Sequence, residues 1–401
     1  MLSVEQTLEQ ILRNIVPLAS LRLPLAEASG RIAAESQTAR CDLPPFDNSA
    51  MDGYAVLSAD VRQASGTTPV TLKLAGRTAA GQAPATSLKP GECLRIFTGA
   101  PMPQGADAVV MQEDTTADGD SVQVLDGVKP WENVRFRGED LKSGVEILQA
   151  GQRLNAQRIG LLAAVGMESV AVRRRPRLAL LSTGNELVEA GQPLGPGQIY
   201  ESNRVALAAL LQSAGAETAL LPMVRDRLED LTALFADALT QYDGVVSTGG
   251  VSVGELDLVK EAFQRAGGQL ESWRVAMRPG KPFAFGSRGK SLFFGLPGNP
   301  VSAFVTASLL VIPAVQRWQG ATQLGLRKVR AQLTERMTNK GDRRHYVRVI
   351  LDANGEVRAT GPQASHLLVT LAQANALLDV PPATTCEVGT SVEVLLLPGA
   401  A

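Results

Sequence analysis

The architecture of this chain is centred on one segment, Asp243-Gly-Val-Val-Ser-Thr-Gly-Gly-Val-Ser-Val-Gly-Glu-Leu-Asp257. Its apolar beginning predicts a short buried strand from Asp243 to Ser247, and a helical pattern runs from Glu255 to Ala266. A strand, a glycine-rich loop and a helix in this order direct backbone N–H groups towards an anion such as a phosphate. The glycines alone fit a plain turn equally well.

Asp257 favours the anion-binding interpretation. A carboxylate in the first turn of a helix normally complements the helix macrodipole. Beside a bound anion, the same carboxylate would repel the ligand unless a cation lay between them. The stretch therefore predicts a phosphate together with a divalent metal ion.

The overall composition is typical of a globular protein with several cores. The chain has 401 residues, of which 45% are hydrophobic and 20% charged. At roughly 150 residues per domain, this length predicts two or three domains, or four if some are small. The formal net charge of −1 argues against a general nucleic-acid or membrane-surface binder. The N-terminal segment is amphipathic and charged, which is not the pattern of a secretory signal.

Cysteine and histidine usage narrows the possible chemistry. Cys41, Cys93 and Cys386 are far apart, form no paired metal motif and are typical of reduced thiols in a cytoplasmic protein. The chain has two histidines, His345 and His366, which excludes a histidine-rich metal site. A Ser-His-Asp triad stays open through His366 alone.

The pattern along the chain changes several times. Residues 1 to about 40 predict one or two helices, and short strands extend from Tyr54 to about Asp140. A helical stretch over 141–172 follows, strands then alternate with helices after Pro176, and the part from about Lys328 is β again. Alternating strands and helices predict a parallel sheet that is covered on both faces.

One uncharged segment, Ser291 to Gln316, imitates a membrane span. Gly295, Pro297 and Gly298 divide it into a strand, a turn and a helix that begins near Val301, and that helix is too short to cross a bilayer. We therefore expect a buried βα unit here.

Three carboxylates follow successive strands of the alternating region. Glu186 follows the first strand, Asp226 the second and Asp257 the third. Ligands bind beyond the carboxyl ends of the strands in such sheets, so we expect all three at one rim. Each also has a simpler explanation: Asp226 with Glu229 fits a capped helix start, and Glu186 fits a solvated surface position. Converging carboxylates need a cation, and oxygen ligands near a phosphate favour Mg²⁺.

A basic segment supplies the opposite charge. Arg274, Arg278 and Lys281 lie along the stretch Trp273 to Pro282, on a strand and its turn. They could bind an anion, and charges at an exposed strand edge explain them equally well.

Seven motifs occur in a fixed order between Asn48 and Pro300, and the resemblance that they carry runs from about Leu2 to the C-terminus. They are Asn48-Ser-Ala-Met-Asp-Gly-Tyr-Ala, Thr98-Gly-Ala-Pro-Met-Pro-Gln-Gly-Ala-Asp, Arg137-Gly-Glu-Asp, Ser182-Thr-Gly-Asn-Glu, Ser247-Thr-Gly-Gly-Val-Ser-Val-Gly-Glu-Leu-Asp, Arg278-Pro-Gly-Lys-Pro and Leu296-Pro-Gly-Asn-Pro. Each motif alone is weak. The ordered set resembles the molybdopterin molybdenumtransferase family, whose members insert molybdenum into molybdopterin and are related to the C-terminal domain of gephyrin.

The resemblance implies an α/β and β multidomain fold. It implies a split helical linker domain over 1–43 and 141–174, an inserted β domain over 44–140, a parallel α/β molybdopterin-binding catalytic domain over 175–322 and a C-terminal β-barrel over 323–401. It also implies an elongated homodimer. The cleft of such a dimer lies between the α/β domain of one subunit and the inserted β domain of the other.

The resemblance further implies roles for individual residues. The acidic cluster of the α/β domain is Glu186, Asp226 and Asp257, with Glu186 and Asp257 as metal ligands, and the partner subunit offers Asp52, Thr98 and Asp140 to the cleft. The substrate-binding residues are Ser247, Thr248, Gly249, Gly250, Ser252 and Gly254 for the adenylylated pterin, Pro297 and Asn299 on a neighbouring turn, and Arg278, Lys281, Arg343, Arg348 and Ser365 for anions including molybdate. Arg274 and Arg278 stand where some relatives carry lysine, which keeps the charge and changes the geometry.

The activity implied is Mg²⁺-dependent release of AMP from adenylylated molybdopterin while the dithiolene sulfurs capture molybdate, which gives the molybdenum cofactor. The implied partners are these two substrates, a second copy of the chain, the molybdopterin adenylyltransferase and downstream molybdenum-cofactor enzymes, without nucleic acid or membrane and in the cytoplasm. Two alternatives stay open. The adenylyltransferase shares the α/β domain but consumes ATP, and a non-catalytic gephyrin-like scaffold would carry an added receptor-binding or trimerising module.

Overall fold

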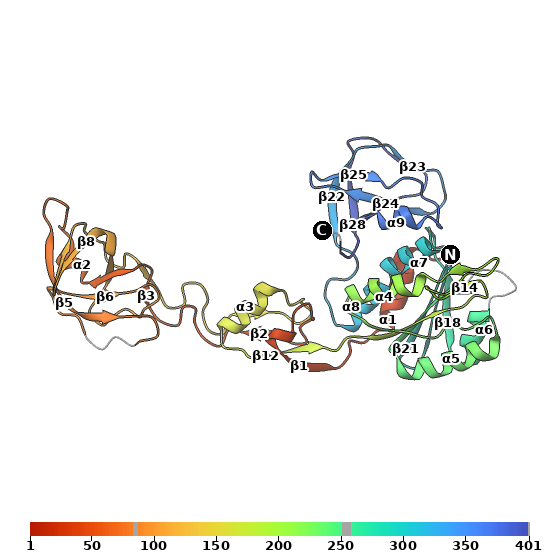
Figure 1. The fold of residues 1–401 in the computed structure, drawn as a ribbon, viewed down its shortest axis with the longest axis horizontal. Coiled ribbons are helices and arrows are strands. Elements are labelled where there is room, and N and C mark those ends of the chain that lie inside the picture. Colours follow the sequence, from red (N-terminus) through yellow and green to blue (C-terminus); the bar gives the residue numbers. More distant parts are fainter. Residues whose placement is uncertain (83–86, 251–257, 400–401) are drawn as a thin grey trace.

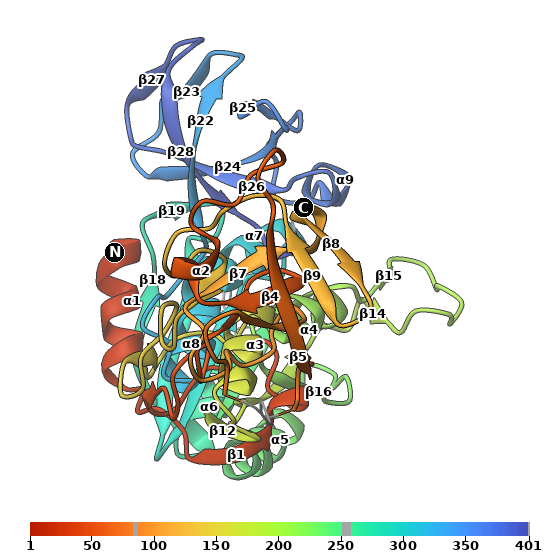
Figure 2. The ribbon, with the colours of Figure 1, turned by 90° about the vertical axis from the view of Figure 1, so that its left-hand side faces the viewer.

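The structure is a computed structural model that describes residues 1–82, 87–250 and 258–399. The molecule is elongated, with a β region at one end, a narrow linker in the middle and an α/β region at the other end (Figure 1). A second, smaller β region stands to one side of the long axis, above the α/β region (Figure 2). The chain therefore folds as separate regions strung along one axis.

The N-terminal helix α1 (Val4–Arg13) packs on the α/β region. Its start is a capping box, in which Ser3 Oγ accepts from the Gln6 backbone N–H and Gln6 Oε1 accepts from the Ser3 backbone N–H. Val4 and Ile11 are buried in the same core cluster as helix α8 (Ile312–Trp318). The helical spacing at the start of the chain is confirmed.

The linker holds less helix than the sequence predicts. Of the one or two helices expected before residue 40, one α-helix forms, and in the rest of the segment β1 pairs with β12 and β2 pairs with β11 across the linker. These pairings supply the backbone partners that a helix would otherwise provide. The elements of the linker are β1 (Ser20–Pro24), η1 (Leu25–Glu27), β2 (Gln37–Thr38), β11 (Glu146–Leu148), α3 (Ala156–Ala164) and β12 (Ser169–Arg173).

The inserted region is built on a six-stranded sheet in the order β7-β4-β6-β5-β9-β8. Alternate side chains such as Val122 and Val124 are buried in its core, as the predicted strand pattern requires. Its elements are β3 (Asn48–Ser49), β4 (Gly53–Val56), α2 (Ser58–Val61), β5 (Val70–Thr78), β6 (Glu92–Ile96), β7 (Ala108–Met111), η2 (Gln112–Asp114), β8 (Thr115–Asp118), β9 (Ser121–Val124) and β10 (Val134–Arg135).

The α/β region has one six-stranded sheet in the order β16-β13-β17-β21-β20-β18. Four neighbouring strands pair in parallel as predicted, whereas β20 is antiparallel to both of its neighbours. Only Gly289 and Lys290 lie between β20 and β21, and so short a connection joins antiparallel strands. The strands are β13 (Arg177–Ser182), β14 (Leu187–Val188), β15 (Ile199–Tyr200), β16 (Glu217–Leu220), β17 (Gly244–Thr248), β18 (Gln269–Arg274), β19 (Met277–Arg278), β20 (Pro282–Arg288) and β21 (Ser291–Leu296).

Helices cover both faces of this sheet, as the alternating pattern predicts. One face, with Leu180 and Val246, packs against α4 (Asn203–Ser213), α7 (Pro300–Thr306) and α8. The other face, with Ala179 and Val245, packs against α5 (Leu228–Gln241) and α6 (Leu258–Arg265). In the sheet, β16 lies on one side of β13 and β17 lies on its other side. The strand order therefore reverses between β13 and β17. A ligand crevice is expected at such a reversal.

The uncharged segment forms the buried βα unit that the sequence predicts, but the expectation of a helix too short to cross a bilayer is wrong, since the helical run Pro300–Trp318 has 19 residues and is long and apolar enough by length and composition. After β21, a continuous helical run comprises α7, a π-helical turn (Ala307–Val311) and α8. The run Pro300–Trp318 has a mean hydropathy of 1.4, and 83% of it is buried inside the protein. Its apolar character is explained by the core of the α/β region.

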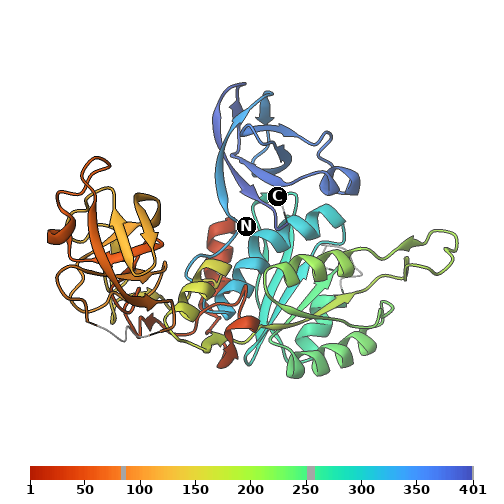
Figure 3. The ribbon, with the colours of Figure 1, turned by 60° about the vertical axis from the view of Figure 1, so that its left-hand side comes forward.

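The C-terminal region is a closed barrel. Five strands follow each other in the order β24-β25-β22-β28-β26, and β26 pairs with β24 to close the circle. The barrel stands over the end of the sheet beside α7 (Figure 3). Its elements are β22 (Lys328–Leu333), β23 (Met337–Asn339), β24 (Arg344–Leu351), β25 (Glu356–Ala359), α9 (Leu368–Ala372), β26 (Ala376–Val380), β27 (Thr384–Cys386) and β28 (Ser391–Leu396).

Candidate functional site

A cleft of about 590 Å³ opens at the carboxyl edge of the α/β sheet, where the strand order reverses. Residues after β13, β17 and β21 line it, together with the segment before α4 and a loop of the barrel. The lining residues are Thr183, Glu186, Leu187, Ile199, Tyr200, Glu201, Ser202, Asn203, Thr248, Gly249, Gly298, Asn299, Pro300, His366 and Leu368. The position agrees with the rule for ligand binding in such sheets.

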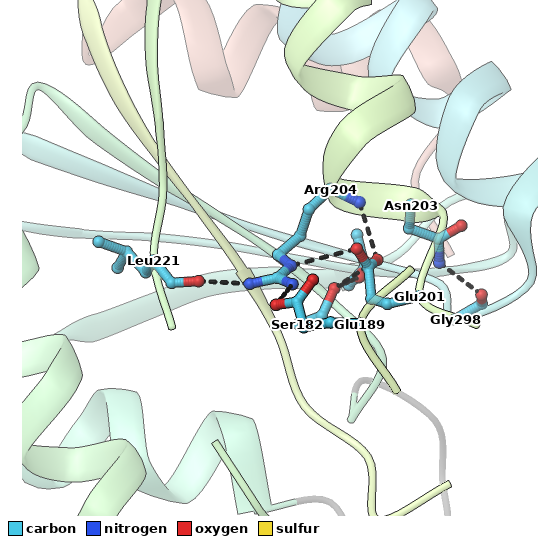
Figure 4. Close-up of polar contacts among 8 residues, drawn as sticks. Ser182, Glu189, Glu201, Asn203, Arg204, Leu221 and Gly298 are labelled. Carbon is cyan, nitrogen blue, oxygen red and sulfur yellow. Dashed lines mark hydrogen bonds and ion pairs between the residues drawn. The ribbon is translucent and has the colours of Figure 1, made fainter. Parts of the chain in front are cut away.

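Two hydroxyl groups join the ends of β13 and β17. Ser182 Oγ and Thr248 Oγ1 are 2.7 Å apart, and Ser182 Oγ lies 3.0 Å from Glu201 Oε1 (Figure 4). All three side chains are buried. A hydrogen-bonded chain therefore runs from the segment before α4 to the strand that leads into the glycine loop.

Glu201 and Arg204 form a buried ion pair behind this chain. Arg204 Nε lies 3.2 Å from Glu201 Oε2, and their side chains are 3% and 1% exposed. Arg204 also donates from Nη2 to Glu189 Oε1 at 2.6 Å and from Nη1 to the Leu221 carbonyl oxygen (Figure 4). This pair is not predicted from the sequence. Its signal is two opposite charges three residues apart at the start of an otherwise apolar helix.

The predicted acidic residues differ in their surroundings. Asp226 is half-buried and accepts a hydrogen bond from the Thr183 hydroxyl. The alternative explanation of Asp226 as a helix cap is wrong, because α5 begins at Leu228, its N-cap is Arg227 and no side chain caps it. Glu186 is exposed and lies over Gly184, where a Cβ would come within 2.7 Å of Glu186 Oε2. Asp257 lies outside the described residues.

Oxygen atoms dominate the donor set at this edge. In the ranges that the structure describes, no group of three His, Cys, Asp or Glu side chains lies close enough to hold a metal ion. Glu186, Asp226 and the Thr183 hydroxyl nevertheless offer hard oxygen donors from two adjacent strand ends. Mg²⁺ prefers such oxygen ligands, and one or two carboxylates together with substrate phosphates suffice for it. The residues therefore fit this ion.

The described part of the glycine loop requires glycine. Gly249 and Gly250 have φ angles of +84° and +62°. A Cβ on Gly250 would lie 2.3 Å from Val259 Cγ2 of α6. Ser247 is fully buried, and within the described residues its hydroxyl has no hydrogen-bond partner. Ser252 and Gly254, which the sequence assigns to the same loop, lie outside the described residues.

The turn after β21 connects the cleft to the barrel. Pro297 is buried, and the Gly298 carbonyl oxygen accepts from Asn203 Nδ2 at 2.7 Å. Asn299 Nδ2 donates to Ser365 Oγ at 3.2 Å, so a loop of the barrel lies directly against this turn. His366 on that loop is exposed and lines the cleft. Among the described residues it makes no hydrogen bond to a serine or a carboxylate, which leaves the triad without support.

Arg348 is fully buried in the barrel and holds the same loop. Its Nη2 donates to the Pro362 and Ala364 carbonyl oxygens at 2.9 and 3.3 Å. Its Nε and Nη1 have no partner in the described part of the chain, and burial lowers the pKa of the guanidinium. A buried guanidinium with unused donors is suited to an anion.

Other basic residues of the predicted anion site surround the junction between barrel and sheet. Strand β19, which ends at Arg278, pairs in parallel with β24. Arg343 donates to the Met277 carbonyl oxygen at 3.1 Å, and both Arg278 and Lys281 are exposed. Burial, and then the charges of Arg278 and Arg348, lower the pKa of His345 to about 4. The junction therefore concentrates positive charge beside a histidine that is neutral at physiological pH.

Three predicted residues lie in the inserted region, at the other end of the molecule (Figure 1). Asp52 Oδ1 accepts from the Thr98 backbone N–H at 2.7 Å and from Thr98 Oγ1 at 2.8 Å, and these bonds, the backbone bond first, lower the pKa of Asp52. Asp140 is exposed, and its backbone N–H donates to the Leu43 carbonyl oxygen at 3.1 Å. Within one chain these residues do not join Glu186.

Family models match all three parts of the chain. Residues 2–166 match the MoeA N-terminal region (domain I and II), residues 179–317 match a probable molybdopterin binding domain, and residues 330–397 match the MoeA C-terminal region (domain IV). Together with the fold, these matches define a multidomain protein whose α/β domain belongs to the family of probable molybdopterin binding domains.

Relatives along the whole chain narrow this class. The chain is 39% identical to a molybdopterin molybdenumtransferase of Nostoc sp. over 97% of its own length and 92% of that protein. It is 37% identical to the enzyme of the same name from Haemophilus influenzae over 94% of both chains. A crystal structure of a molybdopterin biosynthesis MoeA protein from Pyrococcus horikoshii is 33% identical, with a TM-score of 0.84 and 100% coverage of both chains. The chain belongs to the molybdopterin molybdenumtransferase family, and the predicted fold class is confirmed.

Proposed function

We propose that this chain cleaves AMP from adenylylated molybdopterin and transfers molybdenum from molybdate to the pterin, which gives the molybdenum cofactor. The observation that carries the proposal is the contact between Asn299 and Ser365. It joins the cleft at the strand reversal to the basic junction of the barrel. A phosphate-bearing pterin in the cleft and an oxyanion beside the barrel loop would then lie on neighbouring parts of the protein.

The adenylylated pterin would bind at the strand ends and the glycine loop. Thr248, Gly249 and Asn299 line the cleft, and the positive φ of Gly249 lets the backbone approach a ligand closely. Ser247, Gly250, Pro297 and the loop residues Ser252 and Gly254 complete the proposed seat.

The acidic residues would hold Mg²⁺ against the phosphoanhydride. We assign Glu186 and Asp257 as its ligands, with Asp226 in the same acidic cluster. When bound, the ion would neutralise phosphate charge and favour attack at phosphorus. Thr183 fixes the Asp226 carboxylate by its hydrogen bond, and Glu186 stays exposed at the mouth of the cleft.

Molybdate would bind at the basic junction. Arg348 offers unused donors, and Ser365 is held at the end of the Asn299 side chain. Arg278, Lys281 and Arg343 add positive charge around the same place. The transfer then needs no histidine or cysteine nucleophile, because the pterin supplies its own sulfurs.

A second subunit would complete the cleft. Asp52, Thr98 and Asp140 belong to the inserted region, and this region and the α/β region lie at opposite ends of the molecule (Figure 1). In a homodimer, the inserted region of one subunit would bring them to the cleft of the other. The enzyme would work in the cytoplasm, and the molybdopterin adenylyltransferase and downstream molybdenum-cofactor enzymes would be its partners.

Release of AMP tests the proposal. The purified protein would be incubated with adenylylated molybdopterin, Mg²⁺ and molybdate, and the nucleotides separated and quantified. We expect AMP to appear only with Mg²⁺ present, and Glu186→Gln to reduce its release at least tenfold. Glu229→Gln, an exposed acid in the first turn of α5, is the matched control and should act like the parent.

The same assay separates the alternatives. Consumption of ATP with formation of adenylylated molybdopterin would identify an adenylyltransferase instead. Binding of the pterin without any change in nucleotides, at every molybdate concentration, would favour a scaffold.

A further inference from the structure

The hydrogen-bonded chain Glu201–Ser182–Thr248 has a fixed direction. Glu201 faces three donors: the Arg204 backbone N–H at 2.9 Å, Arg204 Nε at 3.2 Å and Ser182 Oγ at 3.0 Å. A carboxylate in an ion pair with a guanidinium only accepts hydrogen bonds. Ser182 must therefore donate its one hydroxyl proton to Glu201.

The donor of the second hydrogen bond, between Ser182 and Thr248, follows from the first. Because the Ser182 proton is already used, the short contact of 2.7 Å between Ser182 Oγ and Thr248 Oγ1 requires Thr248 to be the donor. The Thr248 proton points towards Ser182, and Thr248 lines the cleft. Towards a ligand, Thr248 can offer only the lone pairs of its oxygen.

Buried packing holds this direction in place. Ser182 is completely buried and Thr248 is 3% exposed, so water has little access to reorient either hydroxyl. Arg204 forms an ion pair with Glu201, and its own position is fixed by Leu221 and Glu189 on two other segments (Figure 4). An unpaired donor at this depth would be costly, which disfavours the reverse arrangement.

We propose that Thr248 is a specificity-determining residue that accepts a hydrogen bond from an N–H or O–H group of the substrate, and that Glu201 is the positioning residue that makes it an acceptor. Phosphate and molybdate oxygens, which are acceptors themselves, are disfavoured at this point of the cleft. An N–H or O–H group of the organic part of the substrate therefore lies against the Thr248 oxygen, and the phosphate and molybdate oxygens lie away from this one atom. This inference rests on the proposed substrate and identifies the part of it that donates a hydrogen bond to Thr248.

Equilibrium binding tests the inference separately from turnover. The dissociation constant of adenylylated molybdopterin would be measured by titration calorimetry without Mg²⁺ or molybdate. We expect Thr248→Val to weaken binding about tenfold, the loss of one hydrogen bond, and Thr248→Ser to restore it. Thr240→Val, on the exposed side of α5, controls for the general effect of the substitution.

Ser182→Ala is the second variant, because it frees the Thr248 proton without removing the acceptor. It should weaken binding two- to threefold, less than Thr248→Val. Thermal melting checks that each variant is folded. If Thr248→Val does not fold, the Ser182→Ala result decides, and a dissociation constant equal to that of the parent overturns the inference.

Binding of AMP and of molybdopterin alone shows which part of the substrate carries the hydrogen-bond donor. A weaker affinity of Thr248→Val for AMP assigns the donor to the nucleotide, whereas a weaker affinity for molybdopterin alone assigns it to the pterin. The inference is overturned if Thr248→Val leaves the affinities for both probes unchanged, or if it changes instead the molybdate or Mg²⁺ dependence of turnover. A parent that binds the adenylylated pterin but releases no AMP contradicts the proposed function only. A parent that binds none of the three ligands contradicts both.

Discussion

The Thr183 hydroxyl donates a hydrogen bond to the Asp226 carboxylate, which joins the segment after β13 to the segment after β16. This bond ties an acidic side chain to the rim of the cleft. The start of α5 does not use Asp226 at all, since the N-cap is Arg227. Asp226 therefore contacts a residue that lines the cleft, Thr183, rather than the start of α5.

Asp226→Ala should lower AMP release at least tenfold and leave the stability nearly unchanged. Losing a true helix cap costs about 1 kcal/mol, and no cap is lost here. Thermal melting and the AMP assay check both parts. Asp230→Ala, an acid in the first turn of α5, is the control and should keep full activity. A melting point lowered as for a lost cap, with normal AMP release, would restore the purely structural explanation of Asp226.

Arg348→Met should abolish the stabilisation of the protein by molybdate. A ligand at 100 times its dissociation constant stabilises the native state by about 2.7 kcal/mol, and this requires the unused donors of Arg348 if they hold the anion. Melting curves with and without molybdate measure the effect. Arg330→Met removes an exposed arginine from the same barrel and should keep the full shift. An equal shift in both variants would place molybdate elsewhere.

Acidification should destabilise the protein through His345. Its pKa falls from 6.5 to about 4 in the folded state, chiefly through burial. Between these values the unfolded state binds more protons than the folded state, so the stability from His345 is complete above pH 6.5 and is lost as the pH falls towards about 4. The loss amounts to about 3 kcal/mol at 1.36 kcal/mol per pKa unit.

His345→Asn isolates this contribution from the other titrating groups. Unfolding free energies of parent and variant would be measured from pH 8 to about pH 4 with denaturant. We expect the difference between the two curves to be constant at high pH and to shift in favour of the variant below about pH 6.5. Parallel curves throughout would show that His345 does not titrate differently on folding.

Much of this architecture is readable from the sequence, because its signals are local. The alternation after Pro176 predicts the covered sheet, and the glycines before Val301 divide the apolar segment correctly into β21 and α7. The linker is harder to predict. Strand β1 finds its partner β12 about 150 residues away, and local propensity carries no information about that pairing.

The residues of the candidate site are likewise predictable only where their sequence signals are local. Glu186 and Asp226 are predicted from the rule that ligands bind at strand ends, and Thr248 is predicted from the pattern of a strand, a glycine-rich loop and a helix. Glu201 and Arg204 are not, because charged residues beside a helix start usually face water, and only the packed fold shows that this pair is buried. The direction of the hydroxyl chain depends on that burial, so it could not be inferred before the fold was known.

Subunit exchange can show whether two subunits contribute residues to the same cleft. Asp52 lies with Thr98 in the inserted region, whereas Glu186 lies at the sheet edge. If one cleft takes Asp52 from one subunit and Glu186 from the other, Asp52→Ala and Glu186→Ala homodimers should both be inactive. Each of their clefts then carries one lesion.

Mixing the two variants should restore activity. Subunit exchange gives a heterodimer in which one cleft carries both lesions and the other carries none. Activity should therefore rise towards about half the parent rate per heterodimer if the clefts act independently. AMP release is measured before and after exchange, and native mass spectrometry with a tag on one variant counts the heterodimers. A mixture of an inactive variant with itself, put through the same exchange, is the control. Confirmed heterodimers that release no AMP would mean that Asp52 and Glu186 do not serve one cleft across the subunit interface.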